Sequence, residues 1–311
     1  MPIDIRKRLQ DTNEVLVYCL SMHTLLSYWG KDMEDHLSYW VITHPEEFKD
    51  CVRQCVANGG DLVSVGTQAA SPWRAETFGL RDKVYEMNYK SAKLAKEAIP
   101  AGRYVVGFVS MTNPDFLEPV GNMTYDEVYE GYKLQISALL EGGADMIWVS
   151  GNHIDEGLIA VKVAKDLADI AVGMSNVYYM GKKGFRTMVG VDPQTASARA
   201  QAAGVDVIGF NCGLMTKDSR DPQEWYRGAV DLVKQIKQGT DRPAAAMPDP
   251  CLPELIDGQT VWAATPDDLA RAVPDLIEAG ARLIGGCCGT NLEHYRKVSE
   301  VLRERGVKAS Y

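Results

Sequence analysis

The stretch "EAGARLIGGCCG" (residues 278–289) passes from the end of a helical segment, through a glycine, into a short apolar run. Three other stretches have the same form: "ANGGDLVSVGT" (57–67), "EGGADMIWVSG" (141–151) and "AAGVDVIGFNCG" (202–213). Glycine is common just after a helix, and runs of β-branched and apolar residues favour strands. The repeated pattern therefore predicts a chain in which each helix is followed by a buried strand.

Eight apolar runs are expected to be strands, at 15–20, 62–67, 104–110, 146–151, 170–178, 205–211, 244–249 and 282–288. Amphipathic segments with apolar residues three or four positions apart lie between them, as in 125–143 and 224–239. Eight alternating β and α units, with no proline- or serine-rich linker, predict one α/β domain over residues 1–311, a (β/α)8 TIM barrel. The first connection, residues 20–61, is long and is expected to carry extra helix on the active face.

Composition narrows the class of protein. The 311 residues are 46% hydrophobic and carry a net charge of -9, without a basic run. This balance argues against nucleic acid as a partner. Residues 1–15 have no apolar signal core, and no segment approaches the roughly 18 uninterrupted apolar residues of a membrane helix. We therefore expect a cytoplasmic protein without membrane contact.

The seven cysteines are an odd number in a chain much larger than a disulfide-stapled secreted domain. Cys212 ends the sixth predicted strand, and Cys287 and Cys288 end the eighth. Because chemistry in TIM barrels sits at the C-terminal ends of strands, these three thiols should meet at one rim. Three thiolates suit one Zn²⁺ ion with an open fourth position. The alternative is that they are buried core residues, the usual fate of a free cysteine.

The pair of motifs "GFNCG" (209–213) and "GGCCGT" (285–290) resembles the zinc-binding signature of the homocysteine S-methyltransferase family, which includes betaine-homocysteine methyltransferase and the homocysteine module of cobalamin-dependent methionine synthase. The resemblance covers essentially the whole chain. It implies a TIM barrel, with Cys212, Cys287 and Cys288 as zinc ligands and methyl transfer to a zinc-bound thiolate. A three-thiolate site keeps a bound sulfur deprotonated and nucleophilic at neutral pH.

The chain departs from this family where the amino acid is held. The resemblance implies an acid where Cys19 stands, a glutamate where Ser150 stands, and asparagines where Gly66 and Asp249 stand. An ammonium group without those two carboxylates would be desolvated and unpaired, at a cost of several kcal/mol. We therefore expect a substrate other than homocysteine, with Cys19, Ser150, Gly66 and Asp249 lining its pocket.

Three further rim residues are candidates. His23 follows the first strand and is predicted to act as a catalytic proton relay or oxyanion donor, or else as a structural hydrogen bonder. Arg74, after the second strand, would bind an anionic group of the substrate, or else pair with a surface acid. Asn176, at the end of the fifth strand, is expected to line the pocket.

Three functions remain open. The first is a zinc-dependent methyltransferase for a small methyl donor or thiol, serving as the substrate-specific component of a corrinoid-dependent system. No Asp-x-His-x-x-Gly stretch for cobalamin is present, so a corrinoid would come only from a partner protein. The second is homocysteine methylation to methionine, and the third is a non-catalytic zinc-binding module. The first connection could form a lid, an oligomer interface or a corrinoid-protein docking site.

Overall fold

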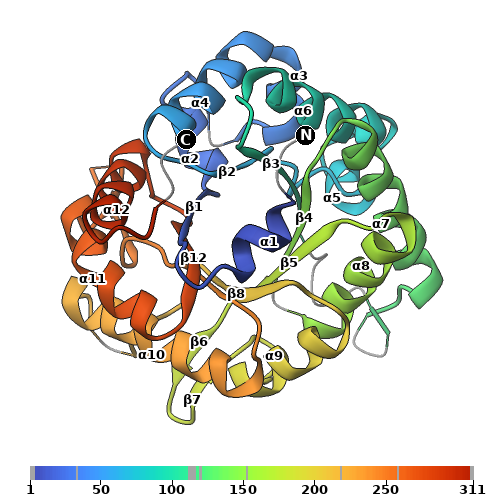
Figure 1. Ribbon diagram of the computed structural model, residues 1–311. Helices are drawn as coiled ribbons and strands as arrows, with labels where there is room; N and C mark the ends of the chain where they lie inside the picture. The colour runs from blue at the N-terminus through green and yellow to red at the C-terminus, as the bar shows by residue number, and fades with distance from the viewer. Residues whose placement is uncertain are drawn as a thin grey trace.

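Eight parallel strands close into a barrel at the centre of the molecule (Figure 1). The structure is a computed structural model, and it describes residues 4–32, 34–110, 117–118, 121–151, 153–217, 219–257 and 259–308. The strand order is β1-β12-β9-β8-β5-β4-β3-β2, and each neighbouring pair is parallel. The predicted (β/α)8 fold is confirmed.

Each barrel strand falls within or beside one of the eight predicted runs. The barrel strands are β1 (Leu16–Cys19), β2 (Leu62–Ser64), β3 (Tyr104–Ser110), β4 (Met146–Gly151), β5 (Ala171–Asn176), β8 (Val207–Asn211), β9 (Ala244–Met247) and β12 (Ala281–Gly286). The main outer helices are α4 (Pro45–Ala57), α6 (Val84–Ala98), α7 (Tyr125–Glu141), α8 (Ile154–Leu167), α9 (Pro193–Ala202), α10 (Pro222–Gly239), α11 (Pro266–Glu278) and α12 (Leu292–Glu304).

Side chains alternate between the barrel interior and the layer under the helices, as the pleat of a strand requires. In β1, Leu16 and Tyr18 belong to the buried cluster inside the barrel, together with Trp148 of β4. Val17 and Cys19 belong instead to the larger cluster between the barrel and the helices. The direction of each strand residue therefore decides which of two buried environments its side chain meets.

The first connection contains three helices, α2 (Met22–Ser27), α3 (Leu37–Thr43) and α4. The predicted helical stretch divides between α3 and α4 at His44, because Pro45 occupies the first turn of α4 and cannot continue α3. After β2 the chain forms α5 (Pro72–Glu76) and the short 3-10 helix η1 (Arg81–Lys83) before α6.

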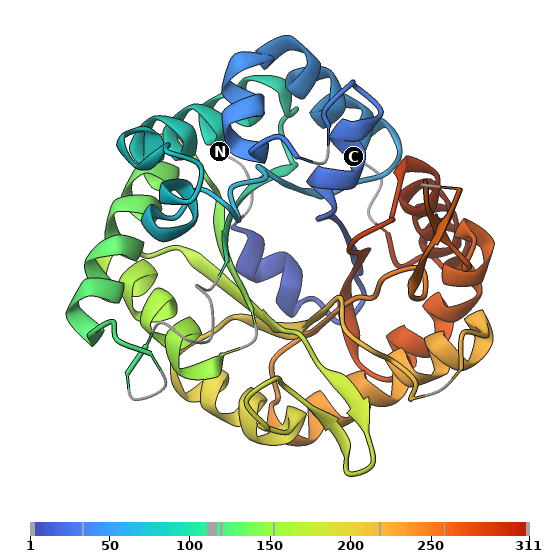
Figure 2. The same ribbon diagram turned by 180° about the vertical axis from the view of Figure 1, so that it is seen from behind.

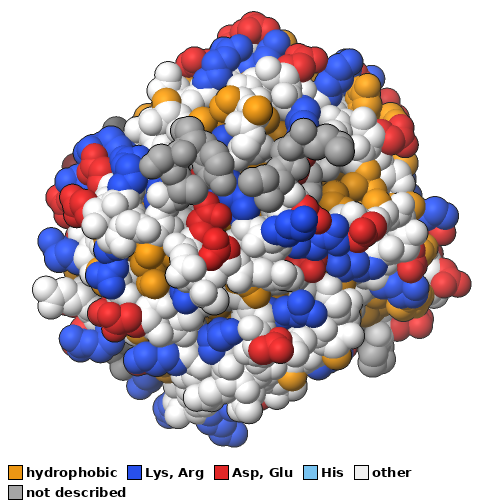
Figure 3. Space-filling view, in the orientation of Figure 1, with side chains coloured by type: hydrophobic (Ala, Val, Ile, Leu, Met, Phe, Trp, Pro, Cys, Tyr) orange, Lys and Arg blue, Asp and Glu red, His pale blue; other side chains and the backbone are white. Residues whose placement is uncertain are grey.

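The sequence analysis did not predict α1 (Ile5–Gln10), which lies across the N-terminal end of the barrel (Figure 1). Ile5 and Leu9 join the buried cluster of the barrel interior. Asp61, before β2, accepts a hydrogen bond from Lys308 and lies 3.6 Å from Arg8. These contacts hold both ends of the described chain on one face, where acidic and basic side chains are interspersed (Figure 3).

Two antiparallel hairpins also lie outside the prediction. One pairs β6 (Tyr179–Gly181) with β7 (Gly184–Arg186), and the other pairs β10 (Pro253–Ile256) with β11 (Gln259–Trp262). They follow β5 and β9, and β6–β7 projects from the face opposite α1 (Figure 2). None of the helices in the described residues combines the length and apolar character that crossing a bilayer requires.

Candidate metal centre

The C-terminal ends of β8, β9 and β12 are joined by backbone hydrogen bonds. The N–H of Cys212 donates to the carbonyl of Met247, at 3.2 Å, and the N–H of Cys287 donates to the carbonyl of Pro248, also at 3.2 Å. The end of β9 is thus fastened to both cysteine-bearing loops. Asp249, which follows directly, therefore lies between them.

Cys212 turns toward the other thiols through an unusual backbone conformation. Its φ is 53°, in the left-handed region, and Gly213 follows with a φ of 98°. A left-handed conformation costs a non-glycine residue about 1–3 kcal/mol and is found where function or the surrounding structure imposes it. The chain is held there because the N–H of Leu214 donates to the carbonyl of Tyr178, at 2.9 Å.

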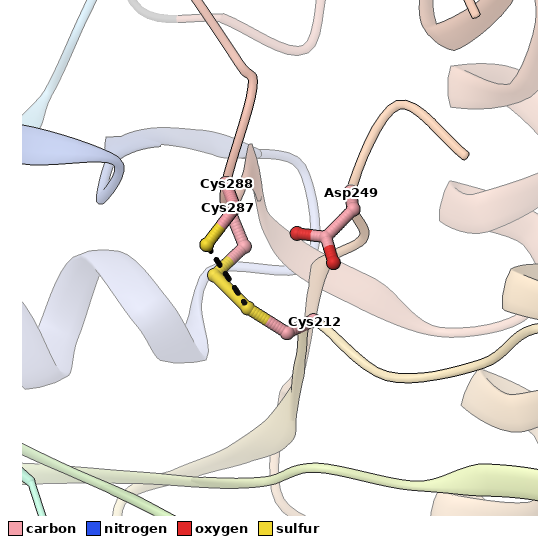
Figure 4. A group of neighbouring side chains, drawn as sticks. All are labelled: Cys212, Asp249, Cys287 and Cys288. Carbon is pink, nitrogen blue, oxygen red and sulfur yellow. Dashed lines mark hydrogen bonds between the residues drawn. A yellow bond between two sulfur atoms is a disulfide. The ribbon is translucent and has the colours of Figure 1, made fainter. Parts of the chain in front are cut away.

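Four side chains meet at this point, namely Cys212, Asp249, Cys287 and Cys288 (Figure 4). One ligand atom from each lies within 4.8 Å of the others. Cys212 and Cys287 are joined as a disulfide, with 5.5 Å between their Cα atoms, and Cys288 Sγ lies 3.8 Å from Cys212 Sγ. The two adjacent cysteines, Cys287 and Cys288, are not joined to each other.

The donor set fits zinc when the sulfurs are reduced. Tetrahedral zinc with Zn–S bonds of about 2.3 Å separates its sulfur ligands by about 3.8 Å. The distance between the sulfurs of Cys212 and Cys288 matches this separation. A disulfide between Cys212 and Cys287 leaves neither sulfur as a thiolate, so the disulfide and a three-thiolate site are alternative states of the same atoms.

Asp249 brings a carboxylate that is almost fully buried, with 8% of its surface exposed. Its Oδ1 has no hydrogen-bond partner among the described residues. Burial raises the pKa of Asp249 well above its usual range, although a hydrogen bond from the Cys288 backbone acts in the opposite direction. An unsatisfied buried carboxylate beside three sulfurs is suited to receive a cation.

The surrounding protein also desolvates the sulfur of Cys288 and raises its pKa to about 11, and the negative charge of Asp249 adds to this effect. Without a cation, Cys288 would therefore remain a protonated thiol at neutral pH. Metal binding would displace this proton, since the thiolate is the form that binds a metal.

A chain of hydrogen bonds inside the barrel reaches the same sulfurs. Ser150 Oγ and Ser175 Oγ each donate to Asn211 Oδ1 at 2.6 Å. Trp148 Nε1 donates to Ser175 Oγ at 2.8 Å, and Asn211 Nδ2 donates to Cys287 Sγ at 3.6 Å. All five side chains are buried. The network connects β4, β5 and β8 to the loop after β12.

Of the residues predicted to line the pocket, the structure brings Asp249 to the cysteines directly and Ser150 through Asn211. Cys19, by contrast, follows an inward-facing Tyr18 and points under the helices, with its Sγ 4.0 Å from the carbonyl of Cys55. Asn176 likewise follows an inward-facing Ser175, and its Nδ2 donates to the hydroxyl of Tyr178 at 3.5 Å.

Gly66 serves the backbone rather than the cysteine group. It has a φ of 69°, and a Cβ at this position would lie 3.0 Å from Met22 and 3.2 Å from Leu37. Its carbonyl accepts a hydrogen bond from Ser38 Oγ, at 2.9 Å. The glycine thus allows the chain to turn beneath α2 and α3. Its neighbours are residues of these two helices, so the structure does not bring it to the cysteines as its predicted pocket role would require.

His23 and Arg74 lie outside the group of four. His23 is in the first turn of α2, and Thr24 Oγ1 beside it accepts a hydrogen bond from the N–H of Gly289, at 3.0 Å. Burial lowers the pKa of His23 to about 4, and the charge of Lys31 adds to this effect, so its imidazole is neutral at pH 7. Arg74 is an exposed residue of α5, where the Ser71 side chain caps the helix.

The sequence analysis missed two residues near the sulfurs, Asn211 and Ser175. Asn211 lies in the stretch 202–213 and Ser175 in the predicted strand 170–178, and each directly precedes a residue that the sequence analysis did single out, Cys212 and Asn176. Strand alternation was the available signal. Asn211 lies four residues after the inward-facing Val207, on the same face of β8. Ser175 lies four residues after the inward-facing Ala171, on the same face of β5.

Comparison with known proteins identifies the family of the chain. The sequence profile of a family described as homocysteine S-methyltransferase matches residues 16–302. A methionine synthase of Mycobacterium leprae is 26% identical over 270 residues, which are 83% of this chain and 21% of that protein. The chain thus spans about a fifth of the length of this curated relative.

Solved structures show a similar fold. The homocysteine methyltransferase MmuM of Escherichia coli, in its oxidised form, superimposes with a TM-score of 0.74 at 18% identity, covering 94% of this chain and 98% of that one. Its metallated form gives a TM-score of 0.73 at 18% identity, covering 92% and 96%. At this level of identity the likeness establishes the barrel fold.

Proposed function

The chain belongs to the homocysteine S-methyltransferase family, a zinc-dependent family of methyl-transferring enzymes, and from this premise we propose that it is a zinc-dependent methyltransferase for a small substrate other than homocysteine. Cys212, Cys287 and Cys288 would hold one Zn²⁺ ion. The substrate would present a sulfur or other heteroatom at the fourth position. The convergence of three sulfurs on one point of the barrel rim supports this proposal most strongly.

Bound zinc would lower the pKa of a coordinated thiol while leaving its sulfur nucleophilic. The protein's own contribution is to fix the sulfurs. Cys212 is held by its left-handed turn, and Cys287 by its backbone bond to Pro248. Asp249 would supply a carboxylate as a further ligand, or as a negative charge near the metal, when no substrate is bound. Asp249 and Cys287 are buried, whereas Cys288 is exposed, so a substrate would reach the metal from the side of Cys288.

The substrate proposal depends on two missing carboxylates. The Cys19 side chain points away from the barrel interior, and the Ser150 hydroxyl is hydrogen-bonded to Asn211. Neither position supplies an anionic partner for the ammonium group of homocysteine. We further propose that the enzyme is the substrate-specific component of a corrinoid-dependent system, with the corrinoid on a partner protein. The methionine synthase relative, about five times longer than its matched segment, supports such an arrangement.

One observation favours the alternative, homocysteine methylation to methionine. Asp249 places a buried carboxylate within 4.8 Å of the sulfurs. This carboxylate could pair with an ammonium group that enters beside a zinc-bound thiol. The two functions therefore differ in whether homocysteine sulfur reaches the metal.

Zinc-edge X-ray absorption on the reduced, zinc-loaded protein, with and without homocysteine, tests this difference. We expect three sulfurs and one oxygen or nitrogen in both samples. A change to four sulfurs on addition of homocysteine would establish the alternative. A protein that retains no zinc under reducing conditions would remove the basis of both functions. If zinc is bound and homocysteine leaves its coordination unchanged, methyl donors and other thiols are screened by the same measurement.

A further inference from the structure

We propose that Asn211 is a positioning residue for the metal centre, which donates an N–H···S hydrogen bond to Cys287 in an orientation imposed by Ser150 and Ser175. The inference rests on the proposed zinc site and deepens it. It assigns a role to the serines of β4 and β5, which hydrogen-bond to Asn211.

The orientation of the Asn211 amide follows from the hydrogens available around it. The indole N–H of Trp148 can only donate, so Ser175 Oγ must accept from it, at 2.8 Å. The hydroxyl hydrogen of Ser175 is then free to donate to Asn211 at 2.6 Å, and Ser150 donates to the same atom, also at 2.6 Å. Two donors identify their common acceptor as the amide oxygen, which leaves the NH2 group directed at Cys287.

The opposite orientation of the Asn211 amide, with its oxygen and NH2 group exchanged, is unfavourable for two reasons. The NH2 group would face the two hydroxyls, and the Ser175 hydrogen would lose its acceptor inside a fully buried site. The amide oxygen would face the sulfur of Cys287, where a thiolate would repel it. The low dielectric of the barrel interior enlarges both penalties. Burial and the hydrogen-bond network therefore both favour the orientation in which the NH2 group of Asn211 faces Cys287.

Because Asn211 directs its N–H donor at Cys287 alone, the electron density on this sulfur would differ from that on the sulfurs of Cys212 and Cys288. A hydrogen bond to a thiolate withdraws electron density from it and stabilises its charge. A site of three thiolates and one dication carries a net charge of about -1, so relief of charge at Cys287 favours metal retention. Ser150 also stands where the family resemblance implies a glutamate. A carboxylate there accepts but cannot donate, and it would draw the Asn211 NH2 group away from the sulfur.

The test compares three variants of the reduced, full-length protein: Asn211→Ala, the double variant Ser150→Ala with Ser175→Ala, and Ser197→Ala. Ser197 is a matched control, because its buried hydroxyl donates to the carbonyl of Pro193 at 2.6 Å on α9. Zinc affinity is measured by competition with a chromophoric chelator. The cobalt-substituted protein reports the energy of the thiolate-to-metal charge-transfer band.

We expect Asn211→Ala to weaken zinc binding by roughly 10-fold to 100-fold, the range for partners of metal ligands. The charge-transfer band should move to lower energy, because the sulfur becomes more electron-rich. The double serine variant should change both quantities in the same direction, while Ser197→Ala leaves them at the wild-type value. Since the double variant retains Asn211, it tests the proposal even if Asn211→Ala does not fold.

Wild-type affinity and an unmoved band in the double serine variant would overturn the inference, while leaving the zinc site itself in place. Failure of the wild-type protein to bind zinc through three sulfurs would instead contradict the proposed function. The two failures are thus distinguished within one set of measurements.

Discussion

Six of the seven cysteines form two groups on opposite sides of the barrel wall, a rim group that extends from the buried Cys287 to the exposed Cys288 and an outer group that is fully buried. Cys212, Cys287 and Cys288 meet inside the rim, next to Asp249. Cys19, Cys51 and Cys55 pack between β1 and α4, where the thiol of Cys51 lies 3.8 Å from the sulfur of Met22. The rim group has a carboxylate and an amide donor around it, whereas the outer group belongs to the hydrophobic core.

This difference shows that the neighbours of a cysteine decide its chemistry. Burial raises the pKa of Cys19 well above its usual value, and Cys19 is fully buried. It therefore stays a thiol and contributes as a small apolar side chain. The rim sulfurs lie at strand ends where a cation can be held and reached. Of the four measurements that follow, three would break or sharpen this contrast, and the one on His294 separates acid sensitivity from it.

The largest expected effect is loss of metal from the rim group alone. Cys288→Ser should weaken zinc affinity by more than roughly 100-fold, because it removes a ligand, and loss of a ligand's hydrogen-bond partner alone costs roughly 10-fold to 100-fold. Cys51→Ser, in the outer group, should retain wild-type affinity. Zinc content after gel filtration under reducing conditions measures both. Equal loss in the two variants would show that the groups are not separate.

Acid pH should destabilise the fold independently of either sulfur group. Burial lowers the pKa of His294 to about 4, and its Nδ1 accepts a hydrogen bond from the Asn291 backbone at the start of α12. The unfolded chain takes up this proton near pH 6.5, so the stability present above that pH is lost as the pH falls toward 4.

This loss amounts to about 3 kcal/mol for His294. Urea unfolding of the metal-free, reduced protein between pH 4 and 7 measures it, and His294→Asn should flatten the profile. Burial also lowers the pKa of His23, so the difference between wild type and variant isolates His294. If the free energy of unfolding of the variant depends on pH as that of the wild type does, the acid sensitivity arises from groups other than His294.

Removing a sulfur from the outer group should affect stability alone. Cys55→Ala should lower the free energy of unfolding by about 1–2 kcal/mol, because a fully buried side chain is truncated and a small cavity remains. Denaturant unfolding gives this value, and the chelator competition gives the zinc affinity in the same sample. A change in zinc affinity would contradict the assignment of this group to the core.

The smallest expected effect concerns Asp249. Its substitution should weaken zinc binding but stabilise the metal-free protein. Asp249→Asn should weaken zinc binding by roughly tenfold or less, since a negative charge beside the cation is lost. The metal-free variant should be more stable than wild type, because an unpaired buried carboxylate is replaced by a neutral amide. Thermal unfolding with and without zinc tests both signs.

The strands and the main helices could be predicted because their signals are local. Short apolar runs predict all eight barrel strands, and glycine turns precede four of them. α1 is too short to show a periodic pattern, and tertiary contacts of Ile5 and Leu9 stabilise it. The hairpin β10–β11 was missed because its strands are exposed and lack the buried pattern.

The candidate site could be predicted only in part, because the position of a residue along a strand was considered and its direction was not. The three cysteines lie just beyond strand ends, in loops that turn toward the rim. Cys19 and Asn176 lie within strands, at positions that alternation directs outward. Asn211 illustrates the remaining difficulty, since its partners Ser150 and Ser175 come from strands distant in sequence.

Lys308 pairs with Asp61, which precedes β2, and α1 lies across the same N-terminal end of the barrel (Figure 1), whereas the cysteines follow the C-terminal ends of β8 and β12. The first and last of the described residues thus lie at the same end of the barrel. A protein attached to a surface through the N-terminal end of the barrel would present the opposite rim to the solution. Preparations immobilised in this way should therefore expose the rim to dissolved ligands.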